Sequence, residues 1–180
     1  KKTSLFGYDM VPSSADLAGA VVELINDPRR EFKLFDVLQN IRTNYDYILI
    51  DCPPSLGLLT INGLTAADSV IIPVQCEYYA LEGLSQLLKT IQLVKENLGS
   101  DVGVMGALLT MYDKRNRLAR EVVKEVRLNF PGKVFDAIIP RCVRLAEAPS
   151  FGQTILQFDI KSAGAKAYRQ LAEEIINLET

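Results

Sequence analysis

Short apolar runs rich in β-branched residues alternate along this chain with longer segments of helical period. Such alternation is typical of βαβ units, in which helices cover a sheet of parallel strands. Most of the runs are apolar at successive positions, as expected for strands that are buried on both faces. We therefore predict an α/β fold, a doubly wound and mostly parallel sheet with helices on both faces. The predicted strands are residues 5–11, 47–51, 70–74, 104–110 and 134–139.

Amphipathic helices are predicted between these runs. The clearest covers residues 78–98, where apolar side chains recur at steps of three and four and Gly99 follows as a stop. Two more are predicted over residues 117–130 and 162–178. Because we find no repeat, low-complexity tract or linker, we predict a single α/β domain over residues 1–180.

The composition excludes several kinds of chemistry. The 180 residues are 48% hydrophobic with a net charge of −2, so a nucleic-acid contact must come from a local basic patch. Histidine is absent, which excludes mechanisms built on a histidine base and, with only three cysteines, disfavours a zinc site. The cysteines are odd in number and form no CxxC, which indicates reduced cytoplasmic thiols. No apolar run reaches the roughly 18 residues of a membrane span, so we expect a soluble protein.

The first candidate site residue is Asp51, which ends an apolar run just before the turn at Pro53 and Pro54. In open α/β sheets, ligands bind beyond the carboxyl ends of the strands. A carboxylate there can hold magnesium through its water shell while substrate phosphates supply further ligands. Alternatively, Asp51 only ends a strand and caps a helix that begins near Leu56. These residues alone leave both interpretations open.

The second candidate is a basic loop after the predicted strand 104–110. Four positive charges fall within seven positions, at Lys114, Arg115, Arg117 and Arg120. The cluster could neutralise nucleic-acid phosphates or be a solvated helix start, and composition alone favours solvation. Cations at a helix N-terminus are electrostatically disfavoured, so an anionic partner would relieve a mismatch.

The third candidate follows the predicted strand 134–139. Pro140 stops the strand, and Arg141, Arg144 and Glu147 follow at three-residue intervals. Proline and apolar groups at a strand end can pack on a purine ring, while the arginines face phosphates or a carboxylate. The alternative is an ordinary surface loop with an internal Arg–Glu pair, which the spacing alone favours.

The usual phosphate-binding motifs do not occur in the sequence. There is no G-x-x-x-x-G-K-[ST] and no G-x-G-x-x-G, and the single Gly-Lys pair at residues 132–133 precedes Val134. Asp51 therefore stands without the phosphate cradle that such a carboxylate would serve.

Together, the three candidate regions resemble the ParA/Soj family of chromosome- and plasmid-partitioning ATPases, P-loop proteins with a deviant Walker motif that also include MinD. The resemblance extends over nearly the whole chain. It is carried by residues 11–20, 45–62, 72–84 and 147–152, and the run Cys-Glu-Tyr-Tyr-Ala-Leu-Glu-Gly is specific to the Soj-like branch.

The resemblance implies roles for five residues. Asp51 corresponds to the Walker B aspartate, a catalytic residue that binds magnesium through water. Pro140 and Cys142 correspond to the adenine-contacting pair, in which many members have Asn in place of Cys142. Arg115 and Arg144 correspond to surface arginines that bind DNA without sequence preference.

The sequence departs from the family pattern in two places. Lys161 and Ala163 stand where the family has arginines, which weakens a basic patch. Family members begin with a strand, a Lys-Gly-Gly-x-Gly-Lys-Thr loop and a switch aspartate, none of which has a counterpart here. We interpret the chain as the C-terminal part of a ParA/Soj-type ATPase, a P-loop NTPase-like fold without its first strand and P-loop. Truncation explains this better than a natural remnant does.

The resemblance also implies cofactors and partners for the complete protein. These are ATP and magnesium, a homodimer, non-specific DNA and a ParB-like protein, in a cytoplasmic and nucleoid-associated setting. For the 180-residue chain itself we expect no ATP hydrolysis and no tightly bound cofactor, since the glycine loop and its lysine are missing. We also expect self-association, because residues 47–51 lack their neighbouring strand.

Three alternatives stay open. The scaffold could be a non-catalytic DNA- or protein-binding module, which the missing phosphate loop favours for this chain. A MinD-like membrane switch would need a basic amphipathic C-terminal helix, and the acidic end at residues 172–180 disfavours it, so we expect no membrane partner. Synthases that amidate cobyrinic acid share the fold, but 180 residues cannot hold their glutamine-handling domain.

Overall fold

The computed structural model describes residues 1–78 and 80–179. Contacts between residues divide the chain into two compact units, which we call the N-terminal unit, Lys1–Ala67, and the sheet unit, Asp68–Thr180. Each is described by itself. The single domain expected over residues 1–180 stays a prediction.

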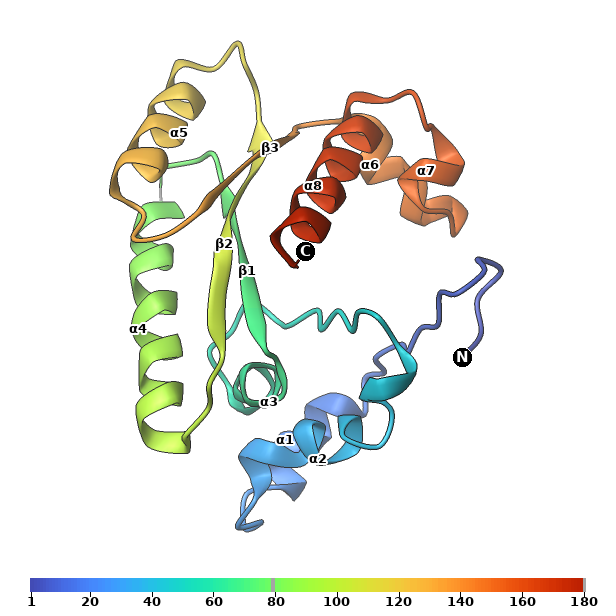
Figure 1. The fold of residues 1–180 in the computed structure, drawn as a ribbon, viewed down its shortest axis with the longest axis vertical. Coiled ribbons are helices and arrows are strands. Elements are labelled where there is room, and N and C mark those ends of the chain that lie inside the picture. Colours follow the sequence, from blue (N-terminus) through green and yellow to red (C-terminus); the bar gives the residue numbers. More distant parts are fainter. Residues whose placement is uncertain (79, 180) are drawn as a thin grey trace. The chain divides into compact units, whose positions relative to one another are not determined.

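The sheet unit contains three parallel strands in the order β1-β2-β3 (Figure 1). They are β1, Ser69–Gln75, β2, Gly103–Tyr112, and β3, Val134–Pro140. Parallel neighbours need crossover connections. The helices α4, Ala80–Leu98, and α5, Arg117–Asn129, supply them. The predicted α/β fold with a parallel sheet is therefore confirmed, as are its strands over residues 70–74, 104–110 and 134–139.

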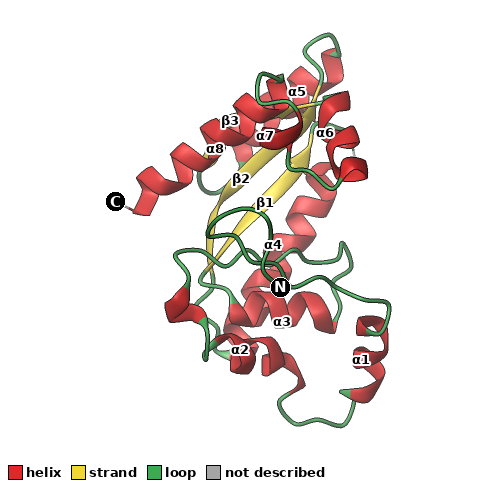
Figure 2. Ribbon diagram, turned by 90° about the vertical axis from the view of Figure 1, so that its right-hand side faces the viewer, coloured by secondary structure: helices red, strands yellow, loops and turns green. Residues whose placement is uncertain are grey.

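Helices lie on both faces of this sheet. In Figure 1, α4 and α5 lie on one face, and α8, Ala163–Glu179, lies on the other. Figure 2 views the sheet unit from the side of α8. The predicted helices over residues 117–130 and 162–178 are confirmed. The helix predicted over residues 78–98 is confirmed from Ala80 onward, while Tyr78 lies in a turn and Tyr79 lies outside the described residues. Short helices precede α8, namely α6, Val143–Glu147, a 3-10 turn, Ala148–Phe151, and α7, Ile155–Phe158.

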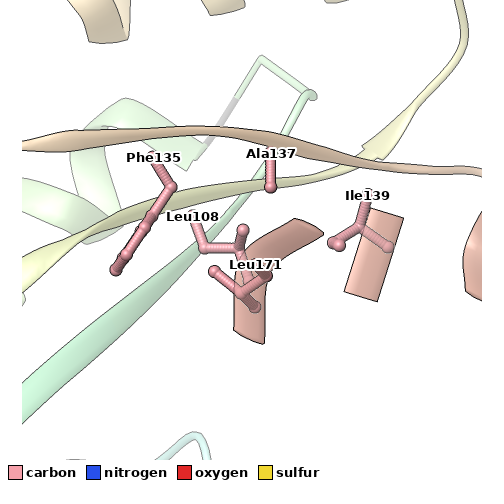
Figure 3. Close-up of a cluster of buried hydrophobic side chains, with 5 residues drawn as sticks. All are labelled: Leu108, Phe135, Ala137, Ile139 and Leu171. Atoms are coloured by element: carbon pink, nitrogen blue, oxygen red, sulfur yellow. The ribbon is translucent and has the colours of Figure 1, made fainter. Parts of the chain in front are cut away.

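The core on the α8 side of the sheet is a cluster of apolar side chains (Figure 3). Alternate residues of β3 point into it, because side chains alternate across a strand. Phe135 and Ala137 have no exposed surface. Burial of each large side chain stabilises the fold by about 1.5–3 kcal/mol, which holds α8 on the sheet. The cluster consists of Leu108, Phe135, Ala137, Ile139 and Leu171.

The N-terminal unit consists of short helices linked by hydrogen bonds of two buried residues, Asn62 and Thr65. The Asn62 side chain accepts from the N–H of Leu34 at 3.1 Å and donates to the carbonyl of Arg30 at 2.8 Å. Thr65 donates to the carbonyl of Glu31 at 2.6 Å. These bonds fix the start of α2 on α3. The elements are α1, Leu17–Glu23, a 3-10 turn, Arg30–Phe32, α2, Lys33–Leu38, a 3-10 turn, Arg42–Asn44, and α3, Leu58–Ala66.

Two predicted strands are wrong. Residues 5–11 turn at Gly7, whose φ is 72°, and the segment forms only an isolated antiparallel bridge between Lys2 and Asp9. Residues 47–51 form no strand, and Leu49 is 86% exposed. An apolar run becomes a strand only where a neighbour pairs with its backbone groups, and no described residue pairs with residues 47–51 as a strand.

No helix in the described part of the chain has the length and apolar content that a membrane crossing requires.

Candidate functional site

The carboxyl ends of the three strands present charged side chains at one edge of the sheet. Glu77 follows β1, and Arg141 follows β3. Arg141 Nη2 donates to Glu77 Oε1 at 2.8 Å, and its backbone N–H donates to the carbonyl of Tyr112, at the end of β2, at 2.9 Å. An exposed ion pair contributes only about 0–1 kcal/mol, so this one orients Arg141 more than it stabilises the fold.

Pro140 and Cys142 lie on either side of Arg141 at this edge. Pro140 is the last residue of β3, and Cys142 is the extended N-cap residue of α6. Both are partly buried. They present a ring and a thiol, which suit an apolar, flat ligand group. The thiol is only a weak hydrogen-bond donor.

Arg115 follows β2 and is held by Asp113. Arg115 Nε donates to Asp113 Oδ1 at 3.2 Å and Nη2 to Oδ2 at 3.1 Å, while the backbone N–H donates to Oδ1 at 2.9 Å. These hydrogen bonds and the positive charge lower the pKa of Asp113, and Asp113 in turn raises the pKa of Arg115. The Arg115 side chain is 86% exposed. It is therefore accessible to an anion, which has to compete with a carboxylate already in place.

Local hydrogen bonds fix the loop between β2 and α5. The Asn116 side chain accepts from the N–H of Leu118 at 2.9 Å, which caps α5. Arg120 Nη1 donates to the carbonyl of Lys114 at 2.8 Å. The basic loop thus has a defined shape and continues directly into the helix.

Arg144 on α6 is held by two carboxylates and a ring. Its Nη1 donates to Glu147 Oε2 at 2.9 Å, and its Nε lies 3.6 Å from Asp159 Oδ2. The guanidinium lies 5.9 Å from the centre of the Phe158 ring, which stacks on Phe151 at 5.1 Å. The side chain is still 55% exposed. The Arg–Glu pair expected for an ordinary surface loop therefore forms, beside an accessible guanidinium.

Gly164 allows α6 to approach α8 closely. A Cβ at position 164 would lie 2.6 Å from Leu145 Cγ, much closer than van der Waals contact. The glycine therefore positions the short helix that carries Arg144.

Asp51 lies in the N-terminal unit and is exposed. Gly57 is the N-cap residue of α3 and no side chain caps this helix, so the interpretation of Asp51 as a helix cap is wrong. The turn after Asp51 is held by Thr60, whose hydroxyl donates to the carbonyls of Pro53 and Ser55 at 3.3 and 2.5 Å. Burial, followed by the charge of Asp51, raises the pKa of the Cys52 thiol.

The hypothesis that Asp51 binds magnesium requires that one protein carboxylate be enough to hold the ion. Within residues 1–78 and 80–179, no group of three or more Cys, Asp or Glu side chains could hold a metal ion by itself. Magnesium commonly keeps several waters and takes one or two carboxylates together with substrate phosphates. The exposed Asp51 carboxylate fits that manner of binding.

Comparison with known proteins decides the family. A family model described as "AAA domain" matches residues 1–104. The chromosome partitioning protein ParA of Caulobacter vibrioides is 52% identical over 180 residues, which cover 99% of this chain and 67% of the relative. The chain belongs to the ParA/Soj family. The sporulation initiation inhibitor protein Soj of Bacillus subtilis is 54% identical over 175 residues, covering 97% of this chain and 69% of the relative.

Solved structures share the fold of this ParA/Soj chain. Cobyrinic acid a,c-diamide synthase from Mycobacterium smegmatis, with bound ADP and magnesium, superposes with a TM-score of 0.76 at 39% identity. The match covers 92% of this chain and 60% of the synthase. Compared with its ParA and Soj relatives, the chain spans about two thirds of their length.

The sequence does not indicate two acidic residues that bind the arginines at the carboxyl ends of the strands. Glu77 belongs to the run Cys-Glu-Tyr-Tyr-Ala-Leu-Glu-Gly, and its bond to Arg141 joins residues 64 positions apart. Asp159 lies 15 positions after Arg144, and no local pattern indicates either contact. The Asp113–Arg115 pair could have been found, since an Asp two residues before an Arg commonly forms an Asx turn.

Proposed function

We propose that this chain is part of a chromosome- or plasmid-partitioning ATPase of the ParA/Soj type. Its complete form binds ATP with magnesium, dimerises and binds DNA without sequence preference. The observation that carries the proposal is the 52% identity to a chromosome partitioning ParA across 99% of the chain.

The proposal assigns the nucleotide chemistry to three residues. Asp51 is the catalytic carboxylate that binds the magnesium ion through water. This role is supported by the exposure of Asp51 and by the fact that Asp51 does not cap helix α3. Magnesium bound there would neutralise negative charge on the phosphates. Pro140 and Cys142 form the adenine contact, supported by their position at the carboxyl end of β3.

The proposal assigns DNA binding to Arg115 and Arg144. Both are exposed and both follow strands at the same edge of the sheet unit. An arginine can exchange a carboxylate for a phosphate, since the fork of N–H donors fits either anion. The other proposed partners are a second copy of the protein and a ParB-like protein, in the cytoplasm at the nucleoid.

Charge reversal at the two arginines tests the proposal. Fluorescence anisotropy measures binding of the complete protein, with ATP and magnesium, to two unrelated duplexes over a salt series. Arg115→Glu and Arg144→Glu should each weaken binding to both duplexes equally. Each should also reduce the slope of log K against log salt by about 0.9, since one phosphate contact is lost. Unchanged affinity, or a loss on only one duplex, would contradict the proposal.

A further inference from the structure

Helix α5 carries a row of cations that neither the family resemblance nor the proposed function assigns. Arg117, Arg120, Lys124 and Arg127 follow one another at steps of three, four and three residues, so they lie along one face of the helix. All four are exposed. At a rise of about 1.5 Å per residue, the row extends for about 15 Å. We call it the α5 stripe.

The α5 stripe differs in its charge partners from the three arginines that follow strands β2 and β3. Arg115, Arg141 and Arg144 each form an ion pair with a carboxylate. Among the described residues, no carboxylate oxygen lies within 4 Å of a side-chain nitrogen of Arg117, Lys124 or Arg127. Most of the stripe is therefore free to pair with an external anion.

The two acidic residues of the same helix leave α5 with a net positive charge. Glu121 and Glu125 are exposed on α5, but Glu125 Oε2 accepts a hydrogen bond from Asn129 Nδ2 at 2.9 Å rather than from a cation. Arg120 donates to the carbonyl of Lys114, which leaves its positive charge in place. The first-turn cations also face the positive end of the helix dipole, which an anion would offset.

Burial on the other face of α5 favours a nucleic acid over a membrane as the partner of the stripe. Ala119, Val122 and Val126 are between 1% and 4% exposed, so the middle of the apolar face is already buried in the domain, and only Leu118 and Leu128, near the two ends of the helix, are exposed. A basic amphipathic helix binds a lipid surface by inserting that apolar face. Duplex DNA needs only the cations, and it carries one negative charge per about 1.7 Å of its axis, or about nine along the stripe.

We propose that the α5 stripe is a phosphate-binding surface for duplex DNA, which extends the contact from Arg115 along the helix. The proposal rests on the proposed function, because it takes DNA as the partner. The proposal assigns to the stripe a large share of the sequence-independent DNA binding, because most of its cations have no carboxylate partner that a phosphate would have to displace.

A pair of matched double variants tests the proposal. Lys124→Glu with Arg127→Glu reverses two charges of the stripe. Lys166→Glu with Arg169→Glu reverses an exposed Lys and an exposed Arg, also three residues apart, on α8 across the sheet (Figure 1). Anisotropy with a duplex over a salt series is measured for the complete protein with ATP and magnesium. The α5 variant should lose at least about tenfold in affinity and about two units of salt slope, while the α8 variant changes affinity by less than about threefold.

The outcomes separate this proposal from the proposed function. Equal losses of DNA affinity in the two double variants mean that only the net charge of the protein matters. That result overturns the proposal for the α5 stripe, even if Arg115→Glu also weakens DNA binding. A loss confined to the α5 variant supports the stripe even where Arg115→Glu and Arg144→Glu have no effect. Binding to phosphatidylserine vesicles that the α5 variant loses, with unchanged DNA affinity, also overturns it. If the charge reversal lowers the unfolding midpoint, Lys124→Gln with Arg127→Gln must give the same fall in slope.

Discussion

At the scale of single residues, the arginines proposed to bind DNA already have carboxylate partners. Asp113 holds Arg115, and Glu147 and Asp159 hold Arg144. A phosphate therefore has to displace an ion pair before it binds. Exposed pairs contribute about 0–1 kcal/mol, so this competition weakens DNA binding modestly and does not prevent it.

Removing the carboxylate should free Arg115. We expect Asp113→Asn to raise the affinity of the complete protein for duplex DNA about two- to fivefold, measured by anisotropy at low salt. Arg115 lowers the pKa of Asp113, so the carboxylate is ionised throughout the neutral range and the gain should not vary with pH there. Asp101→Asn, at an exposed acid outside these pairs, is the control. Equal affinities for the two variants would show that Asp113 does not restrain Arg115.

The sequence indicated the cations of the site better than their partners. Arg115 and Arg144 are exposed at strand ends, where the motifs placed them. Glu147 and Asp113 are near their arginines in sequence, but the pair of Arg144 and Asp159 depends on tertiary packing, so no local pattern indicates it. The interpretation of Asp51 as a helix cap was left open, and only the observed N-cap at Gly57 excluded it.

At the scale of elements, α8 protects the outer side of β3, the last strand of the sheet. The strand β3 has no partner on its outer side within the described sheet. Glu174 of α8 accepts hydrogen bonds from the backbone N–H groups of Asp136 and Ala137 at 2.8 and 2.7 Å. Unpaired N–H groups at a sheet edge invite another strand, and this carboxylate occupies two of them.

Loss of the Glu174 carboxylate should weaken this edge. We expect Glu174→Ala to lower the free energy of unfolding in urea by about 1–3 kcal/mol, because two N–H groups lose a charged acceptor. Amide hydrogen exchange at Asp136 and Ala137 should become faster. The neighbouring Glu173→Ala changes an exposed residue and should stay within about 0.5 kcal/mol of the wild type. If both variants unfold alike, Glu174 does not protect the edge.

Local pattern identified the long helices more reliably than the strands, while it missed the short helices α1, α2 and α7. The helices α4, α5 and α8 carry their period within their own sequence, so each could be predicted without knowledge of its neighbours. A strand depends on a partner that its own sequence does not specify. The apolar runs at residues 5–11 and 47–51 look like the confirmed strands, yet neither is paired into a sheet.

At the scale of the whole molecule, the alternation of runs and helices was sufficient to predict the fold class. Parallel strands joined by crossover helices give a sheet covered on both faces, and β1, β2 and β3 lie in sequence order as such units predict. Physical pattern alone does not reach the function, because one scaffold supports many activities. The family came from motifs and from the relatives that share them.

The central claim is that this chain is part of an ATPase whose magnesium is bound at Asp51. The most direct test is phosphate release from ATP by the complete protein, with and without magnesium. The wild type should show magnesium-dependent release, and Asp51→Asn should lower it at least about tenfold, because the amide lacks the charge that orders the metal's water shell. Asp46→Asn, at an exposed acid five residues earlier, should release phosphate like the wild type. Wild-type release by Asp51→Asn, or no release by the wild type, would contradict the claim.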